Sequence, residues 1–322
     1  MMRGRIIKGI GGFYEVLCDG QIYTCRARGR FRKEKLTPLI GDWVSFTPGM
    51  HRPAGGSLGR AGNAVSDQPC AASGQPNEGE ELGAVDAIEP RRNALKRPPL
   101  ANLDLLLCVC AAKSPAPDLL LVDKLLLQAK QIDCDVVLVL NKCDLADQDA
   151  LQALTRQYTG AVRAVYPVSA ARGDGLEALR AGISGLCCCL AGQSGVGKSS
   201  LLNALFPQLG LVTGEVSQRM DRGKHTTRHV ELLMLEGGGA VADTPGFSLL
   251  EMESLEPRLL PALYPEFKAY EGKCRFNGCL HQSEPGCAVK DAVAQGAISQ
   301  ERWQRYGELL QELKERWRDR YD

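Results

Sequence analysis

Residues 192–200 read GQSGVGKSS, and this stretch decides the fold of the middle of the chain. It matches the pattern G-x-x-x-x-G-K-[ST] at every fixed position, namely Gly192, Gly197, Lys198 and Ser199. The apolar run LCCCLA precedes it and the helical pattern SSLLNALF follows it. Glycines in such a loop let backbone N–H groups approach phosphates, and the helix N-terminus favours negative charge. The stretch therefore predicts a phosphate-binding loop rather than an ordinary Gly-rich turn.

The same loop supplies most of the predicted nucleotide contacts. We expect Lys198 to reach the β- and γ-phosphates and the Ser199 hydroxyl to bind Mg²⁺. The other loop residues that we assign to GTP binding are Gln193, Ser194, Gly195, Val196 and Ser200.

A second segment, NKCD at 141–144, predicts a reader of the guanine base. It follows the apolar run VVLVL, so it lies at a predicted strand end. Asp144 can accept N1–H and the 2-amino group of guanine, whereas adenine would leave the carboxylate unpaired. Asn141 can bond the base edge and neighbouring loops, the Lys142 stem can pack over the ring, and Cys143 completes the segment. Taken alone, NKCD is also compatible with a polar loop after a strand.

Two more segments complete the predicted site. Ser169 and Ala170 close the apolar run AVYPV, and the Ala170 N–H can meet guanine O6. DTPG at 243–246 follows another apolar segment. There Asp243 can hold Mg²⁺ through water, and the Gly246 N–H is available to the γ-phosphate.

The order of these segments differs from that of an ordinary GTP-binding domain, because the base reader precedes the phosphate loop. Short apolar runs alternate with helical stretches such as Leu119–Lys130 and Leu176–Ala181, which predicts a parallel sheet covered on both faces. Ligands of such sheets bind at the carboxyl ends of the strands. Contacts there do not depend on where the chain is cut, provided the old termini lie close. We therefore interpret the order as a circular permutation.

The region before these segments, residues 1–92, has the pattern of a small β-barrel. Short alternating segments are punctuated by Gly and Asp, as hairpins require. Residues 48–83 are rich in glycine and lack aromatic residues, so we expect a flexible insertion between strands. Residues 1–35 hold nine Lys or Arg against three Asp or Glu, although the whole chain has a net charge of +1. This excess fits a nucleic-acid face or a solvated strand surface equally well.

The C-terminal region, residues 251–322, contains a Cys/His cluster and ends in a helical stretch. The cluster has the spacing C-x₄-C-x-H-x₅-C, formed by Cys274, Cys279, His281 and Cys287. Three thiolates and one imidazole suit a closed tetrahedral Zn²⁺ site with a structural role. Unligated thiols in a loop are the alternative. With Trp303 and Trp317 as the expected main aromatics, the region should need the metal to stay folded.

Composition bounds the class of protein. The chain has 322 residues, of which 44% are hydrophobic and 24% charged, as in soluble proteins of two or three domains. No apolar run approaches the ~20 residues of a membrane span, and no signal peptide is evident. Thirteen cysteines, three of them adjacent at 187–189, then fit a reducing cytoplasm, with the triple cysteine in a buried strand.

Taken together, the motifs resemble those of the circularly permuted GTPases of small ribosomal subunit biogenesis, the RsgA family. The similar segments span nearly the whole chain: GDWV, NKCD, PVSA, GQSGVGKSSLLNAL, GKHTTRHVEL, ADTPGF and the Cys/His cluster. The resemblance implies a multidomain α/β protein. It would have an N-terminal OB-fold barrel (1–92), a permuted P-loop GTPase domain (93–250) and a mostly helical zinc domain (251–322). It also implies binding to the small subunit late in its maturation. The 48–83 insertion departs from the usual compact loop.

The segment RGKHTTRH occupies the place of the first switch. Thr226 and Thr227 are both candidates to close on Mg²⁺, and we favour Thr227. Phe247 stands where many GTPases carry a water-orienting Gln, so we expect slow intrinsic hydrolysis. His225 is our candidate for the residue that orients the attacking water in place of this Gln, as the resemblance also implies. The alternative is that His225 only contacts RNA or solvent.

The sequence thus predicts a monomeric, ribosome-dependent GTPase that uses Mg²⁺ and binds ribosomal RNA through its basic barrel. A rival interpretation is a guanine-nucleotide sensor that controls a protein partner, which Phe247 favours. A zinc-finger regulator of DNA is disfavoured because no recognition-helix pattern is present.

Overall fold

The computed structural model describes seven stretches of the chain. These are residues 1–49, 51–53, 82–95, 98–211, 230–235, 238–243 and 255–319, without the side chains of Arg32, Pro53 and Asp243. Contacts divide the chain into two units. The first comprises Met1–Leu106, Leu176–Leu190 and Lys198–Phe247. The second comprises Leu107–Gly175, Ala191–Gly197 and Ser248–Asp322.

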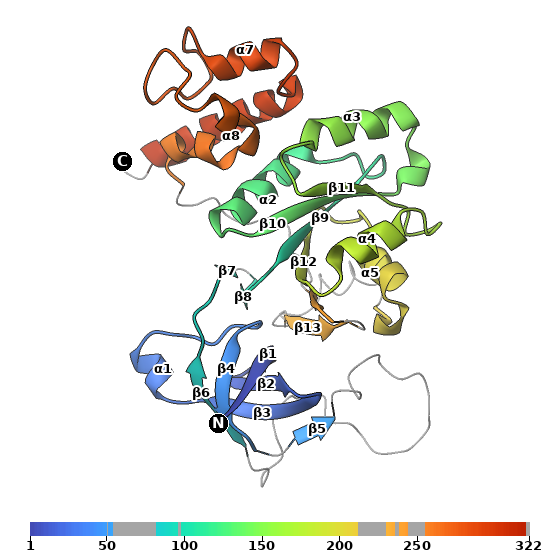
Figure 1. Ribbon diagram of the computed structural model, residues 1–322, viewed down its shortest axis with the longest axis vertical. Coiled ribbons are helices and arrows are strands. Elements are labelled where there is room, and N and C mark those ends of the chain that lie inside the picture. Colours follow the sequence, from blue (N-terminus) through green and yellow to red (C-terminus); the bar gives the residue numbers. More distant parts are fainter. Residues whose placement is uncertain are drawn as a thin grey trace. The chain divides into compact units, whose positions relative to one another are not determined.

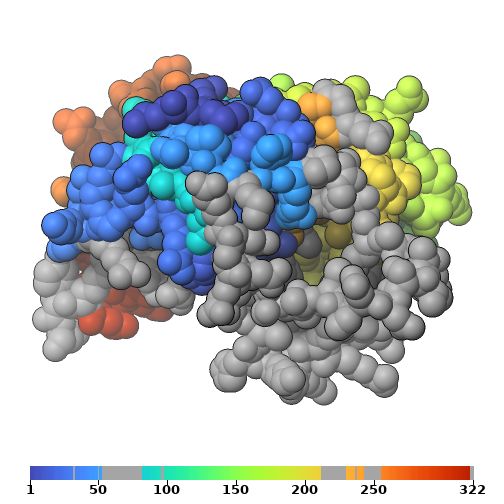
Figure 2. Space-filling model, turned by 90° about the horizontal axis from the view of Figure 1, so that it is seen from below, coloured from blue at the N-terminus to red at the C-terminus, as the bar shows by residue number. Residues whose placement is uncertain are grey.

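The N-terminal part of the first unit is a closed barrel, drawn in blue with its last strand in teal in Figure 1. Its strands are β1 (Met2–Ile10), β2 (Phe13–Cys18), β3 (Gln21–Ala27), β4 (Trp43–Thr47) and β6 (Gly83–Ile88), with the short helix α1 (Arg30–Lys33) after β3. The antiparallel ladders β1–β2, β2–β3, β4–β6 and β1–β4 and the parallel ladder β3–β6 close it. Alternate residues point inward, and Ile6, Val16, Val44, Phe46 and Val85 are fully buried. Figure 2 shows the outer surface of this barrel.

The predicted insertion is shorter than expected at both ends. Residues His51–Pro53 form strand β5, which pairs with β3, and Gly83 begins β6. Pairing with β3 orders residues 51–53 despite their composition. The local sequence pattern does not reveal this pairing. Residues 54–81 lie outside the described residues.

The first unit also contains strands from the segments around the predicted phosphate loop. They are β12 (Cys187–Ala191, its last residue in the second unit), β13 (Glu231–Met234) and β14 (Ala240–Asp243). Strand β14 runs parallel to β12 and antiparallel to β13, and β13 pairs with β1 at Glu231 and Lys8. The three adjacent cysteines of β12 are buried, as the apolar run predicts. The remaining elements are β7 (Ala94–Leu95), β8 (Leu100–Ala101), α4 (Leu176–Ile183), α5 (Lys198–Leu205) and η3 (Pro207–Leu209).

The second unit carries the strand ends of the base-reading segments. Its elements are β9 (Leu105–Ala111, the first two residues in the other unit), α2 (Leu119–Gln131), β10 (Asp135–Asn141), η2 (Cys143–Leu145), α3 (Gln148–Tyr158) and β11 (Ala164–Pro167). Strand β10 lies between β9 and β11 and pairs in parallel with β11. Every residue of β9 is buried, as continuous apolar strands require.

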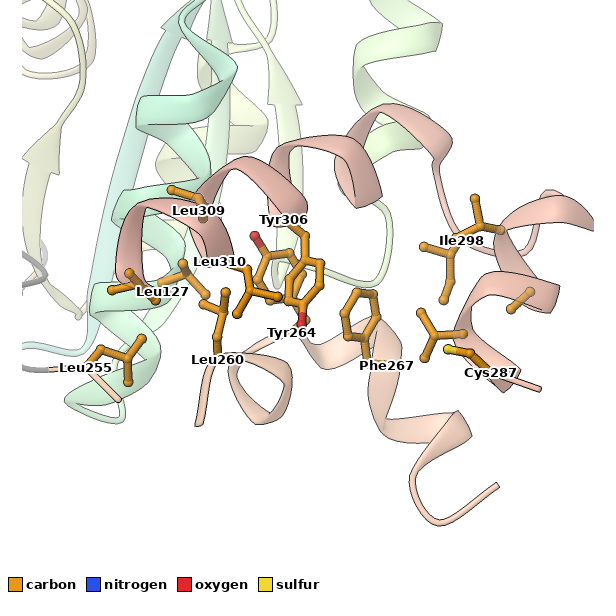
Figure 3. Close-up of a cluster of buried hydrophobic side chains, with 14 residues drawn as sticks. Leu127, Leu255, Leu260, Tyr264, Phe267, Cys287, Ile298, Tyr306, Leu309 and Leu310 are labelled. Atoms are coloured by element: carbon orange, nitrogen blue, oxygen red, sulfur yellow. The ribbon is translucent and has the colours of Figure 1, made fainter. Parts of the chain in front are cut away.

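The C-terminal region of this unit consists of helices around an aromatic core. The helices are η4 (Pro257–Leu263), η5 (Pro265–Tyr270), α7 (Ala288–Ala294) and α8 (Gln300–Arg318). Tyr264, Phe267 and Tyr306 pack with ring centroids 5.0–5.1 Å apart, and Leu127 of α2 joins the cluster (Figure 3). The expectation that Trp303 and Trp317 are the main aromatics is therefore wrong. Because α2 and α8 share this core, burial that does not depend on a metal contributes to holding the region.

A network of buried ion pairs joins α8 to α2 and η5. Arg302 Nη1 lies 2.6 Å from Asp123 Oδ1, and Arg302 Nε lies 2.5 Å from Glu266 Oε1. Arg305 Nε lies 2.6 Å from the other oxygen of Asp123. The side chains of Arg302 and Asp123 are 4% and 0% exposed, so each charge depends on its partners.

Candidate functional site

The phosphate loop runs from the end of β12 to the start of α5. At two positions in this loop only glycine fits. A Cβ on Gly192 would lie 2.0 Å from the Val109 carbonyl oxygen, and Gly192 has φ of +144°. A Cβ on Gly197, at φ of +91°, would lie 2.6 Å from Asn141 Nδ2. Both distances are shorter than any carbon contact allows. The glycines that the phosphate motif requires are therefore also those that bring β9 and the base-reading segment against the loop.

The base-reading segment holds the phosphate loop through its first two residues. Asn141, 1% exposed, donates from Nδ2 to the Val196 carbonyl at 2.8 Å, and its Oδ1 accepts from the Ala170 N–H at 3.1 Å. Lys142 Nζ donates to the Gly195 carbonyl at 2.8 Å and to the Ser114 carbonyl at 2.7 Å. Three segments far apart in sequence thus meet at one strand edge of the second unit.

The side-chain carboxylate of Asp144 is held in place to accept hydrogen bonds. A hydrogen bond from Ser169 holds its pKa below the ordinary range, with the charges of Arg172 and Lys142 as smaller causes. Ser169 is itself fully buried, and its hydroxyl accepts from the Arg172 N–H at 3.1 Å. The Cys143 N–H donates to the Val168 carbonyl at 3.1 Å, so this residue fixes the loop through its backbone. An ionised Asp144 can accept two N–H donors from a base.

The remaining predicted site residues fall in four groups. Gln193 and Ser194 lie in the loop of the second unit, whereas Lys198, Ser199 and Ser200 begin α5 in the first unit. Asp243 is the last residue of β14. The switch and its neighbours, His225, Thr226, Thr227, Gly246 and Phe247, lie outside the described residues.

The predicted metal ligands come together in the C-terminal region. The ligand atoms of Cys274, Cys279, His281 and Cys287 all lie within 4.8 Å of one another. His281 Nδ1 is 3.3 Å from Cys287 Sγ and 3.6 Å from Cys274 Sγ, and the two sulfurs are 3.9 Å apart. Zinc–ligand bonds of 2.0–2.3 Å give tetrahedron edges of about 3.3–3.8 Å, so the spacing suits that ion.

The surroundings of these ligands also favour a bound cation. Burial raises the pKa of the Cys279 thiol to about 12, so a thiolate there needs a compensating positive charge. Burial lowers the pKa of His281, which keeps its imidazole neutral. Trp303 Nε1 donates to the His281 carbonyl at 2.8 Å, and Glu284 accepts from the Leu280 N–H at 2.9 Å. These contacts orient the loop that carries the ligands.

Much of the basic excess at the N-terminus is neutralised by acids that lie far away in sequence. Ion pairs join Arg3 to Glu89, Lys8 to Glu231 and Arg28 to Asp86. Arg26, Arg30, Lys33 and Lys35 are exposed and form no ion pair with the described residues. Arg26 instead lies over the Phe13 ring, 4.4 Å from its centroid. The free cations therefore gather at the end of β3 and around α1.

Comparison with known proteins places this geometry in a family. A family model described as RsgA GTPase matches residues 88–253, and one described as RsgA N-terminal domain matches residues 3–52. The chain is 42% identical over 319 residues to the small ribosomal subunit biogenesis GTPase RsgA of Geobacillus thermodenitrificans, which covers 98% of this chain and 99% of the relative. The chain belongs to the RsgA GTPase family. It is accordingly a GTPase, an enzyme that hydrolyses GTP.

Solved structures support the same assignment. YjeQ from Thermotoga maritima matches with a TM-score of 0.77 and 32% identity, over 97% of this chain and 98% of that one. YloQ, described as a circularly permuted GTPase, matches with a TM-score of 0.73 and 35% identity, over 98% and 96%. The predicted multidomain α/β fold, with its barrel and its circular permutation, is confirmed.

Several contacts at these sites could not be predicted from the sequence. The Ser114 carbonyl that receives Lys142, the network around Arg302 and the acids that neutralise the barrel cations all come from distant segments. A backbone carbonyl has no residue signature, so no local pattern could have revealed the first of them. No helix among the described residues is long and apolar enough to cross a membrane.

Proposed function

We propose that the chain assists late maturation of the small (30S) ribosomal subunit as a GTPase that the ribosome activates. Its relatives carry the name small ribosomal subunit biogenesis GTPase at about 40% identity over nearly their full length. We propose the same domain organisation that the sequence predicts. Residues 1–92 bind ribosomal RNA, residues 93–250 bind and hydrolyse GTP, and residues 251–322 bind zinc. The protein acts as a monomer in the cytoplasm and has no membrane partner.

For the reaction we propose the following roles. Asn141 and Asp144 select guanine, the loop from Gly192 to Ser200 holds the phosphates, and Lys198 reaches the β- and γ-phosphates. Ser199, Thr227 and Asp243 hold Mg²⁺, which neutralises phosphate charge when it enters with GTP. Gly246 contacts the γ-phosphate through its N–H.

His225 is our proposed substitute for the water-orienting Gln, because Phe247 has no polar atom to position a water molecule. Dependence on the ribosome follows if the subunit places the switch segment, and with it His225, against the γ-phosphate.

The observation that carries the RNA proposal is the set of free cations at the barrel. We expect Arg26→Ala/Arg30→Ala to weaken binding to small subunits about tenfold and to lower the salt slope by about one per lost phosphate contact. The matched control is Arg28→Ala/Arg52→Ala, which removes the same charge from arginines already paired with Asp86 and Glu15. Subunit affinity measured across a salt series tests this. Equal losses in the two double variants would contradict a specific RNA face.

For the metal we propose one structural Zn²⁺ bound by Cys274, Cys279, His281 and Cys287. Cys287→Ser should remove zinc and loosen residues 271–287, while α8 keeps its packing on α2 because that core is apolar and extensive. Metal analysis and amide hydrogen exchange measure the two effects, and Cys143→Ser is the control that should retain zinc. Absence of zinc from wild-type protein purified without chelator would refute the proposal.

A further inference from the structure

A cleft of about 710 Å³ opens beside the barrel within the first unit. Its lining includes Arg3 and Arg5 of β1, Trp43 of β4 and Asp19 of the β2–β3 turn, and Met234 closes it from β13. The nucleotide and metal sites described above do not use these residues. The cleft is large enough for one nucleotide, and its lining combines an aromatic ring, two guanidinium groups and a single acid.

The cleft contains a stacked pair of planar groups. Arg3 Cζ lies 4.3 Å from the centroid of the Trp43 ring, and Arg5 Cζ lies 5.7 Å from it. Glu89 holds the Arg3 guanidinium with two hydrogen bonds, from Nε at 2.7 Å and from Nη2 at 2.9 Å. Because the side chain of Arg3 is still 59% exposed, a further planar group can stack on this pair.

The same cleft has donors for an anion. Arg5 donates to the Gly41 carbonyl at 3.3 Å and the Asn102 carbonyl at 3.2 Å, and a hydrogen bond joins it to the Cys187 thiol. A guanidinium has five N–H donors, so Arg5 keeps donors for a ligand. No carboxylate among the described residues forms an ion pair with it. Its positive charge is therefore available to a phosphate, whereas that of Arg3 is matched by Glu89.

We propose that this cleft is a subsite for one unpaired nucleotide of RNA, with the base against the Arg3–Trp43 pair and the phosphate on Arg5. Stacking on aromatic and guanidinium planes is how proteins hold single-stranded bases. The proposal rests on the proposed binding of ribosomal RNA and deepens it, since it adds a contact apart from the cations around α1. An acidic peptide would find the charge of Arg5 but would gain nothing from the stacked pair.

The test uses the fluorescence of the full-length chain, which has three tryptophans. A single-stranded RNA of roughly ten nucleotides should quench wild-type protein more than Trp43→Phe, because the variant retains only Trp303 and Trp317. Labelled-RNA anisotropy should show that Trp43→Phe keeps its affinity within about twofold, whereas Trp43→Ala loses on the order of tenfold. Unchanged GTP binding in both variants verifies that they are folded.

Three outcomes would overturn the subsite. They are equal quenching of wild type and Trp43→Phe, equal quenching by an abasic ribose-phosphate chain, and equal quenching by polyglutamate. Subunit binding is measured in parallel. If subunit binding persists without a Trp43 signal, the subsite is wrong and the proposed function stands. If the Trp43 signal is present and subunits do not bind, the cleft holds RNA and the proposed function fails.

Discussion

Asp144→Asn is expected to lower the affinity for GDP by on the order of a hundredfold or more and to make xanthosine diphosphate the preferred ligand. The carboxylate accepts two N–H donors from guanine, and an amide offers only one acceptor in that arrangement. Its amide N–H₂ can instead donate to the C2 oxygen of xanthine. The hydrogen bond from Ser169 keeps the side chain aimed at the base edge, which makes the exchange selective.

Titration of both nucleotides against the variant measures this change of specificity. Asp147→Asn is the matched control, because Asp147 is an exposed acid nearby that caps α3 by accepting from the Ala150 N–H at 2.8 Å. Asparagine is an equally good cap, so this control should bind GDP normally. Normal GDP binding by Asp144→Asn would mean that NKCD does not read the base.

Asp123→Ala is expected to destabilise the second unit by about 3–5 kcal/mol, because it leaves buried guanidinium charge without its main partner. Asp123 receives both Arg302 and Arg305 at 2.6 Å, and Glu266 alone cannot balance two cations. Unfolding in urea, followed by a signal from the C-terminal region, measures the loss. The double variant Asp123→Leu/Arg302→Met should recover only part of it, because it removes the buried charge of Arg302 but leaves Arg305 and Glu266 each without a partner.

The matched control for that variant is Glu312→Ala. Glu312 pairs with Lys124 at 2.8 Å on the same two helices, but the side chains are 29% and 23% exposed. Pairs of this kind contribute about 0–1 kcal/mol. If Asp123→Ala costs no more than Glu312→Ala, the buried network does not hold α8 on α2.

The helices and strands that depend on local residue patterns were predicted best from the sequence. The continuous apolar runs correspond to β9, β10 and β12, and the two helical stretches correspond to α2 and α4 within two residues. The polar segments that follow these strands meet, because parallel strands end at the same edge. The contacts of Asn141 with Val196 and Ala170 are the direct consequence.

Features that depend on contacts between residues far apart in the chain could not be predicted from the sequence. Arg302 and Asp123 are 179 residues apart, and nothing in QERWQRY marks its first arginine as buried. Composition overstates the free charge of the basic N-terminus, since Glu89, Asp86 and Glu231 pair with three of its nine cations. The mistaken choice of Trp303 and Trp317 as the C-terminal aromatics has the same origin. The aromatic residues of the buried cluster, which Leu127 of α2 joins, are instead Tyr264, Phe267 and Tyr306.

The proposed ribosome-activated hydrolysis is tested most directly by GTP turnover with and without purified small ribosomal subunits, at low and at high salt. We predict slow intrinsic turnover, a large stimulation by subunits that falls as salt rises, and no such stimulation of His225→Ala. Nucleotide binding that stays tight while subunits leave turnover unchanged would contradict it. That result would favour a guanine-nucleotide switch acting on a protein partner.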